Sequence, residues 1–353
     1  MDLFSNKTIV ITGGTGSLGK VLTRRILSGE CGTPKKLIIF SRDEAKQHFM
    51  RLEYLQKKNP TEEVIYHNFS KTLEFRIGDV RDYASVVNVL RTADIVVNAA
   101  ALKQVPSCEY FPFEAFSTNV IGAENIVRGV REHNFPVEVV VGVSTDKACK
   151  PVNVMGMSKA MQERIFIAAN VTFPKTRFVC VRYGNVLASR GSVIPLFHEQ
   201  IKNGGPVTVT TEQMTRFLLP LDRAVDTVLS AIERAKPGET FVPKVPATSM
   251  MTLAKALIED RKISVEVTGI RPGEKTHEIM VSDEEANRTY LSKDHYAIQP
   301  MLPELVKENK TAVLDGEYSS KDDLMDQPTL YKYLFDNKLL MNQQSGDSGE
   351  FLR

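Results

Sequence analysis

Five residues near the middle of the sequence could carry out proton transfer or hold a ligand beside it. Thr145, Asp146 and Lys147 are consecutive and supply a hydroxyl group, an acid and a cation, which are the groups that acid–base chemistry uses. Met155 and Lys159 are four residues apart, so they share one helix face if a helix has begun by residue 155. A capped loop with solvated charges would explain the same residues, so the surrounding elements decide between the two interpretations.

The elements on either side of this stretch favour a binding site. Residues 137–143 form a short run of mostly β-branched residues, which predicts a buried parallel strand, and residues 158–166 have the pattern of a helix. Polar groups that leave the carboxyl end of such a strand lie where open α/β sheets bind their ligands. We therefore expect residues 144–147 to lie at the edge of a ligand cleft.

A glycine-rich turn follows the first predicted strand, residues 8–12, and precedes a predicted helix. Glycines at this spacing permit a tight bend, close approach of a pyrophosphate and close packing of the helix on the strand. The helix N-terminus then offers N–H groups and a partial positive charge to the phosphates. The sequence predicts a dinucleotide site here, formed by Gly13, Thr15, Gly16, Ser17, Leu18 and Gly19.

The second predicted strand, residues 35–40, indicates which dinucleotide is bound. NAD sites usually place an acidic residue at the end of this strand, whereas Ser41 and Arg42 come first here and suit the 2′-phosphate of NADP. If Arg42 is instead a surface residue, Asp43 could bind the ribose. The sequence favours NADP, with NAD as the alternative.

The third and fourth predicted strands, residues 73–77 and 94–101, would extend the cofactor site. Asp79 could accept a hydrogen bond from an adenine amino group or cap the predicted helix 83–90. The fourth strand ends in small residues, which would let a flat cofactor lie against the backbone or let a helix pack closely. The cofactor residues expected here are Asp79, Val80, Ala99, Ala100 and Ala101.

The substrate side of the cleft is expected to come from the loop 102–112 and from the chain beyond residue 175. Arg216 and Arg271 lie in apolar surroundings and could clamp a diphosphate, or they could form structural salt bridges. The expected substrate-binding residues are Lys103, Asn185, Ser192, Val193, Arg216, Arg271 and Glu274.

The alternation of strands and helices predicts a doubly wound parallel α/β sheet of the Rossmann type. We expect a cofactor domain over residues 1–180, a smaller substrate-binding lobe over 181–335 that is interleaved with it, and a disordered tail over 340–353.

The composition argues against several classes of partner. The net charge is +2 and the positive residues form no run, so nucleic-acid binding is not expected. The four cysteines lie far apart without C-x-x-C spacing, which suits a reducing cytoplasm and indicates neither a metal site nor a disulfide framework. No stretch approaches the roughly 18 to 20 apolar residues that cross a bilayer. We expect a cytoplasmic protein without a membrane segment.

Seven motifs in order, over roughly residues 5–290, resemble the UDP-N-acetylglucosamine 4,6-dehydratases of bacterial surface-sugar biosynthesis, in the extended short-chain dehydrogenase/reductase superfamily. The usual active-site pair of that superfamily is Tyr-x-x-x-Lys. Met155 takes the place of the tyrosine and Lys159 is retained, as in part of this dehydratase family. The loop 103–112 is most similar to soluble members that invert sugar C5. The motifs are residues 12–19, 40–44, 78–82, 99–106, 144–148, 182–186 and 271–275.

The resemblance implies a redox-neutral dehydration of a UDP-sugar, with NADP as a tightly bound hydride carrier, in a homo-oligomer. Lys147 would remove the C5 proton, which requires a depressed pKa, and Asp146 would protonate the departing C6 hydroxyl, which requires a raised pKa. Thr145 would hydrogen-bond the C4 oxygen, and Lys159 would hold the nicotinamide ribose.

Met155 has no acidic proton, so the base for the C4 hydroxyl is left open between Asp146 and a water held by Thr145. The alternatives to this enzyme are a sugar-nucleotide 4-epimerase, a retaining dehydratase and a non-catalytic NADP-binding protein.

Overall fold

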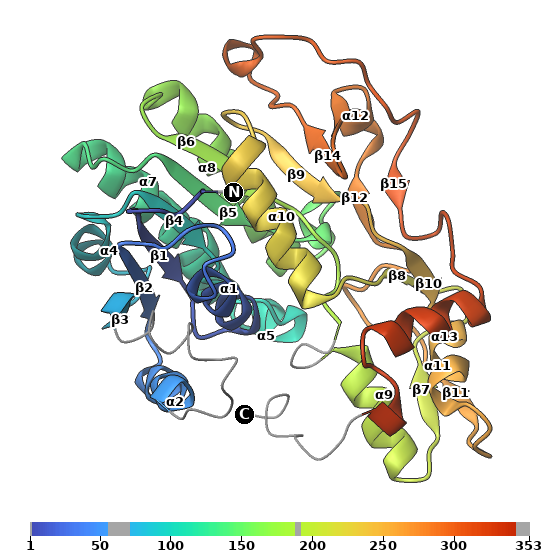
Figure 1. The fold of residues 1–353 in the computed structure, drawn as a ribbon. Helices are drawn as coiled ribbons and strands as arrows, with labels where there is room; N and C mark the ends of the chain where they lie inside the picture. Colours follow the sequence, from blue (N-terminus) through green and yellow to red (C-terminus); the bar gives the residue numbers. More distant parts are fainter. Residues whose placement is uncertain (1, 56–70, 188–191, 344–353) are drawn as a thin grey trace.

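The computed structural model describes residues 2–55, 71–187 and 192–343. Its centre is a nine-stranded sheet with the order β13-β14-β9-β6-β5-β4-β1-β2-β3 (Figure 1). The seven strands from β3 to β9 run parallel, and β14 and β13 extend the sheet antiparallel. The predicted doubly wound α/β fold is confirmed. The strands are β1 (Thr8–Thr12), β2 (Lys36–Ser41), β3 (Leu73–Ile77), β4 (Ile95–Asn98), β5 (Val139–Val143), β6 (Arg177–Val181), β9 (Thr240–Pro243), β13 (Thr289–Ser292) and β14 (His295–Ile298).

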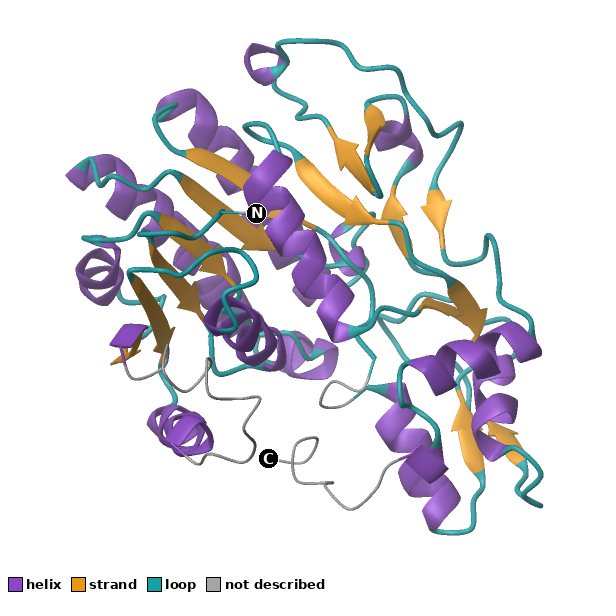
Figure 2. Ribbon diagram, viewed as in Figure 1, coloured by secondary structure: helices purple, strands orange, loops and turns teal. Residues whose placement is uncertain are grey.

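Helices cover both faces of this sheet (Figure 2). On one face, Leu22 of α1 and Val225 of α10 belong to the core, and on the other face Val86 of α4 and Phe166 of α8 do so. Because both faces are covered, the central strands are apolar at nearly every position, and all five residues of β1 are buried. The helices of these layers are α1 (Ser17–Leu27), α2 (Glu44–Leu55), α4 (Tyr83–Leu90), α7 (Gly122–His133), α8 (Val154–Thr172) and α10 (Leu221–Arg234).

A smaller lobe packs around a separate core that includes Phe197, Leu253 and Leu330. The chain leaves the large sheet after β6 to build part of this lobe and returns to the sheet for β9, β14 and β13, so the two parts are interleaved. The remaining elements are α9 (Val193–Lys202), β7 (Val207–Val209), β8 (Thr215–Phe217), β10 (Ala247–Ser249), α11 (Met250–Ile258), β11 (Val265–Val267), β12 (Ile279–Val281), α12 (Asp283–Ala286), β15 (Tyr318–Ser319) and α13 (Gln327–Asp336).

The start of the expected disordered tail is ordered. Leu340 is fully buried and Met341–Gln343 form a 3₁₀ turn, because this segment closes the core of the smaller lobe. The rest of the expected tail, 344–353, lies outside the described residues.

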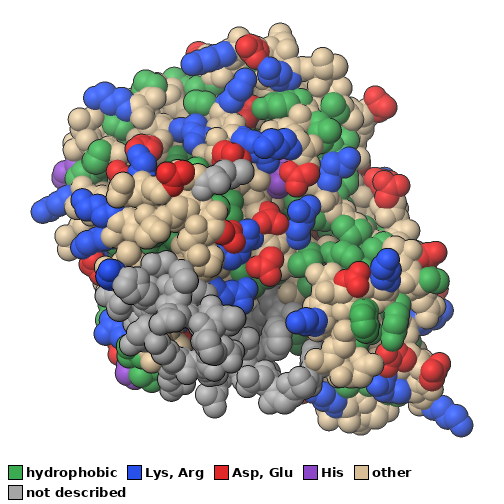
Figure 3. All heavy atoms as spheres, in the orientation of Figure 1, with side chains coloured by type: hydrophobic (Ala, Val, Ile, Leu, Met, Phe, Trp, Pro, Cys, Tyr) green, Lys and Arg blue, Asp and Glu red, His purple; other side chains and the backbone are tan. Residues whose placement is uncertain are grey.

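The surface and the helices carry two further observations. Positive and negative side chains are interspersed over the face shown in Figure 3. Among the described residues, no helix combines the length and the apolar character needed to span a bilayer, and no group of three or more His, Cys, Asp or Glu side chains is placed to hold a metal ion.

The segment between β4 and β5 differs from its expected form. The expected loop 102–112 contains the helix α5 (Val105–Tyr110), and the chain after it forms α6 (Pro112–Phe116), a π-helical turn (Ser117–Ile121) and α7. Asn119 in the π-helical turn is buried and bonds the backbone N–H and C=O of Leu102 and the hydroxyl of Ser158. The turn therefore ties the end of β4 to α8, next to the site described below.

Candidate active site

One cavity of about 1820 Å³ lies at the carboxyl ends of the parallel strands and reaches the smaller lobe. Every residue that the sequence predicted for cofactor, substrate or reaction lines this cavity, apart from Asp146. This convergence follows from the fold, because the carboxyl ends of parallel strands meet at one edge of the sheet.

The glycine turn has the geometry that a dinucleotide site requires. Gly13 has φ +65°, and a Cβ there would lie 2.7 Å from the backbone of Ala100, so the turn packs directly on the end of β4. A Cβ on Gly19 would lie 2.3 Å from the carbonyl oxygen of Gly14. No side chain caps α1 at Gly16 in this described segment, so its first N–H groups face the cavity and suit a phosphate.

The residues at the end of β2 make different contacts. Asp43 accepts a hydrogen bond from the backbone N–H of Lys46 at 2.9 Å and thereby caps α2. The side chain of Arg42 is 58% exposed and lines the cavity, 3.9 Å from Asp79. Ser41 accepts a hydrogen bond from Gln47 at 3.1 Å. Arg42 and Asp43 both line the cavity, and Asp43 is in addition engaged as a helix cap.

Asp79 lies at the cavity wall, and its carboxylate keeps the ionised form that accepts hydrogen bonds. Burial alone would raise its pKa, but hydrogen bonds from Arg81 outweigh burial and hold the pKa of Asp79 below its ordinary value. The alternative role as the cap of α4 is wrong, because Asp82 accepts from Ser85 N and Ala84 N and caps that helix.

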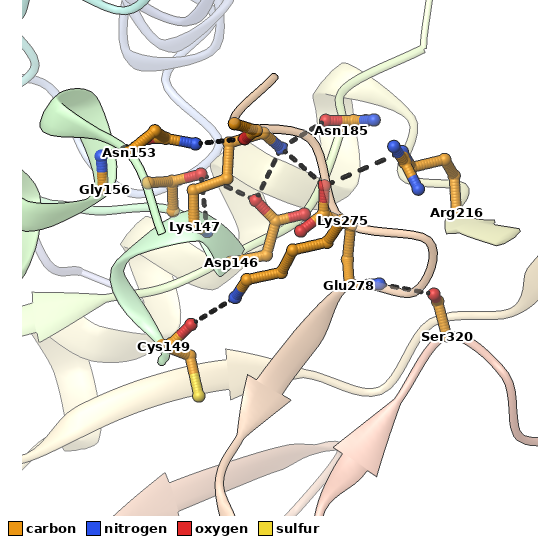
Figure 4. Close-up of polar contacts among 12 residues, drawn as sticks. Asp146, Lys147, Cys149, Asn153, Gly156, Asn185, Arg216, Lys275, Glu278 and Ser320 are labelled. Atoms are coloured by element: carbon orange, nitrogen blue, oxygen red, sulfur yellow. Dashed lines mark hydrogen bonds and ion pairs between the residues drawn. The ribbon is translucent and has the colours of Figure 1, made fainter. Parts of the chain in front are cut away.

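Lys147 is the centre of a buried polar network (Figure 4). It lies in a 3₁₀ turn, Asp146–Ala148, that follows β5 and is capped by the Thr145 hydroxyl. The Lys147 Nζ donates to Asp146 Oδ1 at 3.1 Å and to Asn185 Oδ1 at 3.2 Å, and it lies 3.2 Å from Glu278 Oε1. Three chain segments thus meet at one ammonium group.

The expected depressed pKa of Lys147 is wrong for this state of the protein. Burial acts to lower its pKa, but the carboxylates of Asp146 and Glu278 outweigh burial, and the pKa is raised. Lys147 is therefore an ammonium donor here. The expectation followed from the role of Lys147 as a base and did not include the carboxylate of Glu278.

Glu278 was not predicted from the sequence as a residue of the site. It is 2% exposed and directly precedes the apolar strand β12. Its position before a buried strand could have indicated it, because a buried carboxylate needs a positively charged or hydrogen-bonding partner.

Asp146 lies behind the cavity wall. It is 1% exposed and does not line the cavity, whereas its neighbours Thr145 and Lys147 do. Its Oδ1 accepts from the Thr145 hydroxyl at 2.8 Å and from Lys147, and its buried Oδ2 has no partner among the described residues. Asp146 therefore reaches the cavity through these two neighbours.

Met155 and Lys159 lie on one helix, as predicted. Asn153 accepts from the backbone N–H of Gly156 at 2.8 Å, and this cap starts α8 before residue 155. Met155 is 5% exposed and packs against Cys108 and neighbouring apolar residues. Burial lowers the pKa of Lys159 to about 8, and its Nζ donates to Gln162 at 2.6 Å.

The two arginines on the substrate side differ. Arg216 is buried and donates to the carbonyl oxygens of Thr215 and Thr276, so part of its role is structural. Arg271 is exposed on the cavity wall. Ser192, which precedes α9, lines the same wall, and its buried hydroxyl has no partner among the described residues. Arg271 and Ser192 are thus available to an anionic ligand.

The sequence profile of a family described as polysaccharide biosynthesis protein matches residues 9–300. The chain belongs to this family. A UDP-glucose 4-epimerase of Rickettsia conorii is 47% identical over 301 residues, which are 84% of each chain. A UDP-glucose 4-epimerase of Rickettsia typhi is 48% identical over 288 residues, or 80% of each chain.

Solved structures agree with the fold. Pen from Bacillus thuringiensis superposes with a TM-score of 0.82 at 34% identity, covering 96% of this chain and 99% of that one. The dTDP-glucose 4,6-dehydratase DesIV from Streptomyces venezuelae, with NAD bound, has a TM-score of 0.63 at 20% identity and covers 76% and 86% of the two chains. At that identity the likeness concerns the fold, which is that of extended short-chain dehydrogenases/reductases.

Proposed function

We propose that this protein is an NADP-dependent 4,6-dehydratase that acts on UDP-N-acetylglucosamine and inverts C5. Its family and relatives place it in the class of sugar-nucleotide dehydratases and epimerases of polysaccharide biosynthesis. The substrate, the reaction and the coenzyme are the proposal.

One observation carries the choice of dehydration over epimerisation. The groups that can move a proton are gathered around Lys147, whereas residue 155, the usual place of a tyrosine, is a buried methionine. Both reactions must remove the proton of the C4 hydroxyl, and Met155 cannot do so, so the methionine does not separate them. Dehydration needs in addition a proton carrier for C5 and C6, and Lys147 lines the cavity where one is required.

The cofactor site fits a nicotinamide dinucleotide. When bound, such a cofactor would take a hydride from sugar C4 and return one to C6. The open N–H groups of α1 would hold the pyrophosphate. Arg42 supports NADP, because its side chain is largely exposed on the cavity wall, whereas Asp43 on the same wall is engaged as a helix cap. Lys159 would bind the nicotinamide ribose.

The residues around Lys147 would share the proton steps. Thr145, which lines the cavity, would hydrogen-bond the C4 oxygen. Lys147 would take the C5 proton and pass it to the C6 hydroxyl, which leaves as water. After hydride adds to C6, a proton from solvent would return to C5 from the opposite face. Asp146 lies behind the wall, so we propose that it orients Thr145 and Lys147 instead of touching the sugar. The inversion of C5 rests on the likeness of residues 103–112 to inverting dehydratases.

The second candidate is a 4-epimerase, which is favoured by the names of relatives at 47% identity. Incubation of the protein with UDP-N-acetylglucosamine and NADP in deuterated water, followed by proton NMR, separates the two. A C6 methyl signal with deuterium at C5 supports dehydration, and the ring couplings report on inversion. A C4 epimer without a methyl signal would refute the proposal.

Variants of the site test the assigned roles. Lys147→Ala and Asp146→Asn should slow water loss by about 100-fold or more while NADP still binds. Lys150→Ala is the matched control, because Lys150 pairs with Asp283 and Glu317 at the surface, away from the cavity. Turnover of either site variant at the control's rate would contradict the roles.

A further inference from the structure

Three oxygen atoms surround the nitrogen of Lys147, two of them in hydrogen bonds and the third in an ion pair. An ammonium group has three donors, and the acceptors Asp146 Oδ1, Asn185 Oδ1 and Glu278 Oε1 lie 3.1 to 3.2 Å from the Nζ. A base needs a lone pair, so Lys147 must give one proton away before it can act on sugar C5. One of its neighbours has to receive that proton.

Glu278 is held rigidly beside Lys147. Its backbone N–H donates to Ser320 Oγ at 2.9 Å, and its carbonyl oxygen accepts from Ser320 N at 2.8 Å (Figure 4). Its Oε1 lies 3.7 Å from Arg216 Nε, and its buried Oε2 has no partner among the described residues. The Oε2 atom can therefore receive a proton without breaking a hydrogen bond among the described residues.

Glu278 lies behind Lys147 as seen from the substrate. Together they line a small cavity of about 130 Å³, and Lys147, Asn185 and Arg216 line both this cavity and the large one. Glu278 does not line the large cavity, so it can act on a substrate only through neighbours that do, which are Lys147 and Arg216.

The charges around this pair are nearly balanced. Asp146 faces Lys147 from its own 3₁₀ turn, Arg216 from β8, and Glu274 and Lys275 from the segment before β12. Lys275 donates to the carbonyl oxygen of Cys149 at 2.6 Å, and burial lowers its pKa. Within such a cluster, moving a proton from Lys147 to Glu278 changes no net charge.

We propose that Glu278 is a positioning residue that receives a proton from Lys147 once substrate fills the cavity, and this inference rests on the proposed dehydratase function. The N–H bond at Lys147 breaks and an O–H bond forms on Glu278, which converts an ammonium–carboxylate pair into an amine and a carboxylic acid. Substrate binding expels water, which favours the neutral pair. The amine then takes the C5 proton and passes it to the C6 hydroxyl, which leaves as water, and Glu278 returns its own proton to the neutral Lys147 at the end of turnover.

The test compares the wild type with Glu278→Gln and Glu278→Asp. The exchange of deuterium into C5 is measured by NMR across a range of pH, and the formation of reduced nicotinamide on mixing with substrate reports hydride transfer from C4 separately. Melting temperatures show whether each variant is folded.

Glu278→Gln should lower the rate of C5 exchange by about 100-fold while hydride transfer from C4 continues. The deficit should shrink as pH rises, because hydroxide then removes the Lys147 proton and because one of the two carboxylates that raise the Lys147 pKa is gone. Glu278→Asp, which keeps the carboxylate, should recover part of the exchange.

Two results would overturn the inference while leaving the dehydratase intact. The first is that C5 exchange in Glu278→Gln stays within about threefold of the wild type at every pH. The second is that C5 exchange and hydride transfer from C4 fall equally at every pH and the melting temperature is lowered. A wild type that forms neither the C6 methyl group nor deuterated C5 would instead refute the proposed function, and the inference with it.

Discussion

Replacing Gly13 with alanine should damage both stability and cofactor binding. At φ +65° an L-residue is strained by about 1 to 2 kcal/mol. The new Cβ would also lie 2.7 Å from the N and Cα of Ala100, whereas carbon atoms in contact are about 3.5 to 4 Å apart. These are backbone atoms at the end of β4, so they cannot rotate away, and the glycine turn must move.

The loss of stability follows from the backbone strain and from the close contact with Ala100. Overpacking of this kind typically costs about 1 to 3 kcal/mol, so the two terms together predict a loss of about 2 to 5 kcal/mol. Displacement of the turn would also break at least one hydrogen bond to the pyrophosphate, and a hydrogen bond to a charged group contributes about 1.5 to 3 kcal/mol. The Kd for NADP should therefore rise about tenfold to one-hundredfold.

Gly29→Ala is the matched control, because Gly29 has φ +80° and a Cβ there would meet nothing within 4 Å. It should show the backbone strain alone, about 1 to 2 kcal/mol, with unchanged NADP affinity. Melting temperatures and fluorescence titration with NADPH measure the two effects. Equal destabilisation by the two variants, or normal NADPH affinity in Gly13→Ala, would refute the reasoning about the turn.

Three further predictions address the coenzyme, the substituted tyrosine position and a buried ion network. Arg42→Ala should raise the Kd for NADP about tenfold to one-hundredfold and leave that for NAD unchanged in binding titrations; Asp43→Ala should destabilise α2 by about 1 kcal/mol without altering that preference. Met155→Leu should keep the rate of C6 methyl formation within about threefold, because the side chain only packs, and a large loss would point to a role for its sulfur. Burial acts to raise the pKa of Glu285, but Arg182 outweighs it and lowers the pKa to about 2. The stability that ionised Glu285 contributes to the fold is present above its ordinary pKa of 4.5. It is lost as pH falls from 4.5 through about 2. Arg182→Met should therefore destabilise the protein by about 3 to 5 kcal/mol in urea unfolding near neutral pH, and by less as pH falls; a difference that does not change with pH would contradict this.

Local patterns in the sequence were sufficient to predict the sheet and the edge where the site lies. The β-branched runs of β1 and β5 and the spacing of Gly13 and Gly16 act through neighbouring residues, so they can be read without knowing the fold. Parallel strands bring their carboxyl ends to one edge, and this placed residues from six parts of the chain on one cavity.

Interactions between distant segments could not be predicted in this way. The π-helical turn at Asn119 exists because its amide bonds Leu102 and Ser158, and neither contact has a local signature. The ordering of residue 340 likewise depends on packing in the smaller lobe.

The charge state of Lys147 shows most clearly what could not be predicted from the sequence. The sequence placed it beside Asp146 at the end of β5, and its expected role as a base required a depressed pKa. Only the tertiary structure brought Glu278 from the start of β12 to 3.2 Å from its nitrogen, and the two carboxylates together reverse the direction of the shift. Coulombic energy depends on distance in space, and that distance is decided by the packing of the two lobes and not by separation along the chain.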